Sequence, residues 1–440
     1  MVTSILVTEI RLNRAYIINR RSIILSSIGK TSYPYCLYIR SLDLSNLEEL
    51  LDDNIFRDNI AERFFADEME VFRKRPADMY TLRSSPKVDK AAILNLVGDS
   101  ISRFVGESAI AHGGSVAVEE ISGTIEKSAL SRWVADLSRL KYIRLWDGGV
   151  LDSNVADIIA ARCLAFDSLS IYSCDGPQAD AKLASFLGSL RPNTLRFLQV
   201  ISHNEIDGET FLALTHHAGS LKDLRIDGLQ ASAMNALSLL RPCTAIQTLE
   251  LRDCGALVDL ESTENDNLRE IIAWLTSCRQ LKIISLKSFA NGPAILAPVC
   301  LENNIRLEGL TLHNYPLAGN QDFHRALTQQ TSLELLDITA NPEDSFRDDI
   351  DVLVTSLCCL TNLRYLNLLD TSDYFNTQNV QAIANSLTKV LLIYSPPFFQ
   401  PVTDGFKSSK TSPSPDTAST TESGPPSRSC MASAASASTP

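Results

Sequence analysis

The chain has 440 residues, of which 45% are hydrophobic, and its formal net charge is −12. These values are typical of a soluble, acidic, globular protein and exclude a mainly disordered or membrane-embedded chain. The acidic balance also argues against nucleic acid as the main partner, because a phosphate backbone is bound by basic surfaces. Ten cysteines include no C-x-x-C pair. We therefore expect free thiols in a reducing compartment, with no metal and no cofactor.

Residues 1–32 form a segment of uncertain role. Five basic residues face a single acid, Glu9, in the first thirty positions. The apolar clusters are too short for a secretory signal or a membrane span. An arginine-rich, acid-poor start loosely fits a mitochondrial transit peptide, and an ordinary or truncated N-terminus is the alternative.

Residues 33–129 are predicted to form a strand followed by a helical cap region. In YIRSLDL, Ile39, Leu42 and Leu44 occupy positions one, four and six of a short apolar signature, which predicts a strand. Helical spacing then predicts helices over residues 47–51 and 88–105. Over residues 54–72 the apolar side chains are predicted to share one face of a single helix; they are Ile60, Phe64, Phe65 and Met69.

Residues 130–395 repeat this signature. Its first position falls at Leu140, Phe166, Leu195, Leu221, Ile246, Leu281, Leu307, Leu333, Leu363 and Leu387. Subtracting successive numbers gives steps of 26, 29, 26, 25, 35, 26, 26, 30 and 24 residues. A period of roughly 20 to 29 residues with the form L-x-x-L-x-L is that of a leucine-rich repeat. The long step contains a polar stretch, residues 263–267, that we expect to be a loop.

The segments between signatures have the apolar spacing of helices, for example at Val155, Ile158 and Ile159. The predicted fold is therefore an α/β leucine-rich-repeat solenoid, or horseshoe, with a concave parallel sheet and convex helices. After residue 395 the composition changes to serine, threonine, proline and alanine, so residues 396–440 are predicted to be a disordered tail.

The candidate binding residues flank the sixth signature position, because strand side chains alternate and these point away from the helices toward the concave face. The set is Arg144, Trp146, Tyr172, Arg225, Asp227, Glu250, Arg252, Lys287, His313 and Asp337. Tryptophan, tyrosine and arginine are enriched at the energetic centres of protein interfaces. Strands about 4.8 Å apart would make this face roughly 45 Å long, which suits a protein target better than a metabolite.

Motifs of common enzyme classes are missing from the sequence. It contains no G-x-S-x-G, no glycine-rich phosphate loop and no H-E-x-x-H. The adjacent pair His216 and His217 follows a predicted helix, where we expect the two rings to cap its last carbonyls rather than bind a metal. We therefore predict a binding protein and not an enzyme.

Four segments also carry a family resemblance: YCLYIRSLDLSNLEELLDD, SALSRWVADLSRLKYIRLWDG, SLRPNTLRFLQVIS and ETFLALTHHAGSLKDLRI. Over roughly residues 33–395 the chain resembles the fungal F-box/leucine-rich-repeat proteins. The resemblance implies a substrate receptor of an SCF-type ubiquitin ligase in the cytoplasm or nucleus. An F-box upstream would recruit a Skp-type adaptor and a cullin, but no L-P-x-E-like helix precedes Tyr33.

A leucine-rich-repeat scaffold without ligase recruitment is the alternative. A GTPase-activating repeat protein is a third possibility, and no particular arginine in the sequence stands out as its finger. For all of them we expect a protein target on the concave face, and neither nucleic acid nor a membrane as partner.

Overall fold

The structure is a computed structural model of the whole chain. It describes residues 19–74, 88–112, 118–255, 258–261, 266–341, 347–369, 371 and 375–387. The chain divides into two units, residues 1–394 and 395–440. The second unit, which includes the predicted tail, lies outside the described residues, as do residues 263–265 of the predicted loop and most of residues 1–32.

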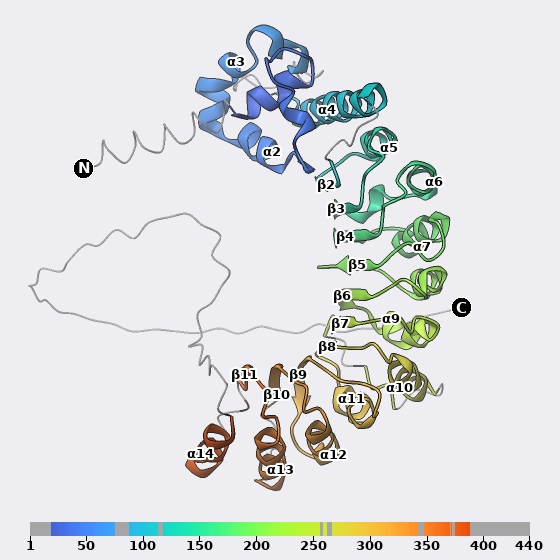
Figure 1. Ribbon diagram of the computed structural model, residues 1–440, viewed down its shortest axis with the longest axis vertical. Coiled ribbons are helices and arrows are strands. Elements are labelled where there is room, and N and C mark those ends of the chain that lie inside the picture. The colour runs from blue at the N-terminus through green and yellow to red at the C-terminus, as the bar shows by residue number, and fades with distance from the viewer. Residues whose placement is uncertain are drawn as a thin grey trace, which may run out of the picture. The chain divides into compact units, whose positions relative to one another are not determined.

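The first unit is built on one parallel sheet whose strands follow one another in chain order. Figure 1 shows the strands along the inner side of a curved array and the helices along its outer side. The described strands are β1 (Ser41–Asp43), β2 (Glu120–Gly123), β3 (Tyr142–Asp147), β4 (Ser168–Ser173), β5 (Phe197–Val200), β6 (Asp223–Leu229), β7 (Thr248–Asp253), β8 (Ile283–Lys287), β9 (Gly309–Pro316), β10 (Leu335–Asn341) and β11 (Tyr365–Asn367).

Helices connect successive strands, and most of them pack on the helix of the next repeat. The α-helices are α2 (Ser45–Asp52), α3 (Ala61–Phe64), α4 (Lys90–His112), α5 (Lys127–Asp136), α6 (Ser153–Arg162), α7 (Ala179–Ser189), α8 (Gly208–Leu214), α9 (Ala231–Ala236), α10 (Asn267–Ser277), α11 (Gly292–Leu301), α12 (Gln321–Ala326), α13 (Arg347–Cys358) and α14 (Thr377–Ser386). Within the described residues, no helix combines the length and the apolar character needed to cross a membrane.

The repeating signature explains the core. In the nine registers that begin between Leu140 and Leu363, the side chains at positions one and four are at most 3% exposed. Strands pair at equivalent positions, so that Leu198 lies beside Leu224 and Leu224 beside Leu249. The predicted leucine-rich-repeat solenoid is confirmed. The tenth register begins at Leu387, and the strand expected after it falls outside the described residues.

The sheet begins earlier than the main array. The strand predicted from Ile39, Leu42 and Leu44 is β1, and it pairs with β2, which the sequence analysis missed. Val118 and Ile121 occupy positions one and four of that repeat, but position six is Gly123, whose φ of +120° suits glycine. The sheet therefore begins before residue 130, where the repeats were predicted to start. Between β1 and β2, the described part of residues 44–117 is mainly helical and forms an insertion inside the first repeat.

The single helix predicted over residues 54–72 is wrong. A short π-helical segment (Phe56–Ile60) leads into α3, and a 3-10 helix (Asp67–Phe72) follows. The break has a local cause, because Asp67 adopts a φ of +57°, a left-handed conformation that cannot continue a helix. The aromatic side chains are nevertheless buried. The apolar pattern therefore predicted which side chains are buried, but not that the helix is interrupted.

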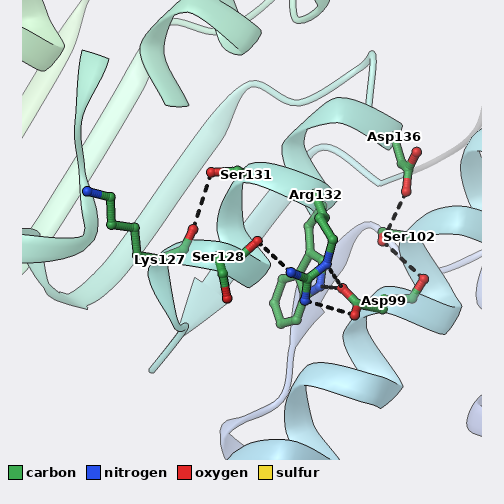
Figure 2. A network of polar contacts seen from close by, with 8 residues as sticks. Asp99, Ser102, Lys127, Ser128, Ser131, Arg132 and Asp136 are labelled. Atoms are coloured by element: carbon green, nitrogen blue, oxygen red, sulfur yellow. Dashed lines mark hydrogen bonds and ion pairs between the residues drawn. The ribbon is translucent and has the colours of Figure 1, made fainter. Parts of the chain in front are cut away.

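The helical insertion joins the array where α4 packs on α5. Gly98, Ser102 and Gly106 are spaced four residues apart on α4, and they let the helices approach closely. Figure 2 shows the polar contacts at this joint. Asp99 accepts hydrogen bonds from Arg132 Nε (3.0 Å) and Nη2 (2.9 Å), and from Trp133 Nε1 (2.8 Å). One carboxylate thus fixes the rotation of α5 against α4.

Candidate interaction surface

All ten candidate residues lie on strands β3 to β10, on the side of the sheet opposite the helices, because the residue before each of them in the strand is buried. Arg144, Trp146, Tyr172 and Arg252 are exposed, and the other six are half-buried. A partner could reach the whole set. Their role in binding stays a prediction.

The charges on β6 and β7 are paired with one another. Arg225 Nε lies 2.8 Å from Asp223 Oδ1, and Arg225 Nη1 lies 3.1 Å from Glu250 Oε1. Arg252 Nη1 lies 3.7 Å from Asp227 Oδ2. The hydrogen bond to Asp223 and the nearby carboxylates raise the pKa of Arg225 despite its partial burial. Both arginines are paired with carboxylates of β6 and β7. An acidic partner would have to displace these carboxylates to bind the arginines.

A second polar group spans β9 to β11. His313 Nε2 lies 3.1 Å from Asp337 Oδ1, without the geometry of a hydrogen bond. Asn367 Nδ2 donates to the same carboxylate oxygen at 2.9 Å. Position seven carries basic types on three successive strands, because Arg252 pairs with Lys287 and Lys287 with His313. Basic side chains therefore occupy position seven from β7 to β9.

Strands β3 to β5 carry aromatic and aliphatic side chains instead. Trp146 is 51% exposed and Tyr172 is 42% exposed, and their ring centroids lie 4.6 Å apart. Ile201 follows β5 and continues the ladder, since its amide donates to the Ile171 carbonyl at 2.9 Å. We call Trp146, Tyr172 and Ile201 the aromatic strip. It is a contiguous exposed apolar surface across three strands.

A third row of side chains on this face was not predicted from the sequence. Residues at position three also point away from the helices, and they include Tyr142 and Phe197, whose ring centroids lie 6.1 Å apart. On β8 and β10 the same row exposes Ile283 and Leu335, with Gly309 between them. Only the neighbours of position six were considered. The same alternation, counted two residues earlier, would have identified this row.

The prediction that His217 caps the end of its helix as a charged ring is wrong. It is fully buried, with Nε2 3.1 Å from the Leu187 carbonyl oxygen and Nδ1 accepting from the Leu195 amide at 3.4 Å. Burial lowers the pKa of His217, so the ring is a neutral core group that connects α7 to the next strand.

Several thiols are equally inert. Burial raises the pKa of Cys163, Cys243, Cys278 and Cys300 to about 12, far above the range of a reactive thiolate. The described part of the chain contains no group of three or more histidine, cysteine, aspartate or glutamate residues that could hold a metal ion.

Comparison with known proteins adds little about function. No family model matches the sequence, and no curated protein matches it. Solved structures do match, among them one described as "Crystal structure of TLR13-ssRNA13 complex", with 14% sequence identity and a TM-score of 0.33. The match covers 57% of this chain and 40% of that chain. At this identity and score it carries no argument about a ligand.

Proposed function

We propose that this chain is a protein-binding scaffold that holds its target on the strand side of the solenoid, with no catalytic role. The observation that supports this most is the aromatic strip. Large contiguous apolar patches are rarely exposed on monomeric proteins unless another molecule covers them, and here the Trp146 and Tyr172 rings lie together on the exposed sheet face at an interplanar angle of 51°. Such residues are the usual anchors of protein interfaces.

The rest of the surface is consistent with a protein partner. The face is formed by rigid, paired strands, so it would lose little conformational entropy on binding. The arginine and carboxylate pairs on β6 and β7 would give specificity, because a partner must replace or complement both signs of charge.

The test is capture of partners from an extract with the full chain and with matched variants. We expect Trp146→Ala combined with Tyr172→Ala to reduce recovery of the main captured protein at least tenfold, since both anchors are lost. The control combines Leu164→Ala with Leu212→Ala, which removes exposed apolar side chains away from the strands. Equal loss with both pairs, or no loss with the first, would count against the proposed surface.

The more specific proposal is that the chain is the substrate-binding part of an SCF-type ubiquitin-ligase receptor, acting in the cytoplasm or nucleus. It rests on the resemblance to fungal F-box/leucine-rich-repeat proteins. The test is co-purification of a Skp-type adaptor and a cullin with the native protein. If the target is captured without the adaptor, the chain is instead a scaffold without ligase recruitment.

A further inference from the structure

Among the described residues, the aromatic strip differs from Tyr142 and Phe197 in having no arginine over its rings. Arg144 Cζ lies 5.2 Å from the Tyr142 ring centroid, and Arg225 Cζ lies 5.8 Å from that of Phe197. These are the cation–π contacts of this face among the described residues. Neither involves Trp146 or Tyr172.

Arg144 is close in sequence to Trp146 but is directed the other way. Its Nε donates to Tyr142 Oη at 3.3 Å, and its Nη2 lies 3.9 Å from Glu120 Oε1 on β2. The hydrogen bond to Tyr142 raises the pKa of Arg144, so the guanidinium keeps its charge there. The chain's own nearby cation is thus engaged at the opposite end of the strand.

Three acidic residues lie at or just beyond the carboxyl ends of β3, β4 and β5, the ends at which the aromatic strip also lies. Asp147 follows Trp146 and pairs in register with Ser173, which follows Tyr172. Asp175 accepts a hydrogen bond from the Ser173 hydroxyl at 2.9 Å, and the Glu205 amide donates to the Cys174 carbonyl at 2.9 Å. All three acidic side chains belong to exposed residues.

A second observation indicates that these carboxylates lie close together. Burial, followed by the charges of Asp147, Asp175, Asp180 and Glu205, raises the pKa of the Cys174 thiol to about 12. The four carboxylates therefore lie near one atom, the sulfur of Cys174, which comes two residues after Tyr172. An aromatic wall edged by negative charge attracts a cation, because the ring faces and the carboxylates favour the same sign.

We propose that the aromatic strip receives an arginine or lysine side chain from a basic segment of the partner protein. The alkyl stem and the cationic head would lie against Trp146 and Tyr172, and the charge would face Asp147, Asp175 and Glu205. Arginine suits the site best, because its planar guanidinium stacks on rings while donating to carboxylates. This inference deepens the proposed function and rests on it.

The test uses a capped pentapeptide of alternating arginine and serine, and a twin with citrulline, which has the shape of arginine without its charge. Titration with the full chain should show at least tenfold weaker binding of the citrulline twin. Trp146→Ala should weaken binding of the arginine peptide at least tenfold, because the stacking surface is lost. Equal affinity for the two peptides, or no binding of the arginine peptide at millimolar concentration, would overturn the inference.

Two variants of equal net charge test whether binding depends on where the removed carboxylates lie or only on the total charge of the chain. The first combines Asp147→Asn, Asp175→Asn and Glu205→Gln, and asparagine can keep the acceptor role that Asp147 has toward Gly149. The second makes the same three changes of charge on helices α6, α10 and α12, at Asp157, Glu270 and Asp322. Both shift the net charge from −12 to −9. The first should weaken arginine-peptide binding at least tenfold and the second should not; equal effects would contradict a local site.

Failure of this inference can be told apart from failure of the proposed function. If the arginine peptide does not bind, but the double variant at Trp146 and Tyr172 still loses its captured protein, the surface binds a partner without a cationic anchor. If neither effect appears, both proposals fail.

Discussion

At the scale of single residues, a buried histidine makes stability depend on pH. His324 is fully buried, its Nε2 lies 3.2 Å from Tyr315 Oη, and its Nδ1 has no hydrogen-bond partner. Burial lowers the pKa of His324 to about 4, although the charge of Asp349 opposes this shift. An unfolded chain would titrate this ring near its ordinary pKa of about 6.5.

The folded pKa lies below the unfolded one, so the unfolded chain binds more protons between pH 6.5 and 4. The contribution of His324 to stability is therefore complete above pH 6.5 and is lost as the pH falls toward 4. From pH 6.5 to 5 the loss is about 2 kcal/mol, at 1.36 kcal/mol for each pKa unit.

We expect His324→Gln to flatten the decline of the unfolding midpoint over this pH range, because glutamine does not titrate. The measurement is denaturant unfolding at several pH values, and the slope matters rather than the absolute stability. Removing an exposed histidine by His203→Gln is the control. A slope as steep in His324→Gln as in the unchanged protein would refute the assignment.

The sequence alone does not show that a histidine such as His324 or His217 is buried. The sequence places His217 after a helix, and a charged cap was a reasonable expectation. What decides its role is the packing of α7 behind it, which comes from another repeat. The position-three row was missed for a different reason: the strand alternation directs Phe197 and Ile283 away from the helices, but the prediction applied this alternation only to the neighbours of position six.

At the scale of elements, the contact between α4 and α5 depends on a glycine. A Cβ atom built on Gly98 would lie 1.9 Å from Trp133 Cζ2. Trp133 is 1% exposed and its indole donates to Asp99, so the ring cannot move aside freely. We expect Gly98→Ala to destabilise the protein by about 1 to 3 kcal/mol, as overpacking of a core does.

The control is a glycine in a helix that has room for a side chain. Gly188 lies in α7, and a Cβ atom there would meet nothing within 4 Å. Gly188→Ala should leave stability unchanged or raise it by about 0.5 to 1 kcal/mol, because alanine lowers the entropy of the unfolded chain. Thermal unfolding and hydrogen exchange in α4 and α5 would measure both. Equal effects of the two substitutions would show that helix propensity, and not packing, determines the result.

Elements were predictable where the apolar signature was complete. Nine registers could be placed because each supplies apolar side chains at positions one, four and six. Strand β2 was not predicted because Gly123 stands at position six, where the signature needs an apolar side chain. The predicted helix over residues 54–72 was too long because the positive φ of Asp67 leaves no trace in the apolar pattern. The periodicity of burial can be read from one sequence, whereas single backbone conformations cannot.

At the scale of the whole molecule, stability should be local. In a solenoid each repeat contacts mainly its neighbours, so the loss of one anchor weakens the repeats around it more than distant ones. Leu224 is fully buried on β6, and β6 pairs with β5 and β7. Leu224→Ala removes a core side chain from the middle of the ladder and should cost about 2 to 5 kcal/mol.

Hydrogen exchange would show where this cost appears. We expect amides of β5, β6 and β7 to lose protection, while those of β1, β2 and β10 keep it, since at least three strands lie between each of these and β6. Arg225→Ala on the same strand is the control, because it removes half-exposed ion pairs that contribute roughly 1 kcal/mol or less. Equal loss of protection along the whole ladder in Leu224→Ala would mean that the array unfolds as one cooperative unit. In that case a partner bound over β3 to β5 would stabilise the far end of the array as strongly as its own strands.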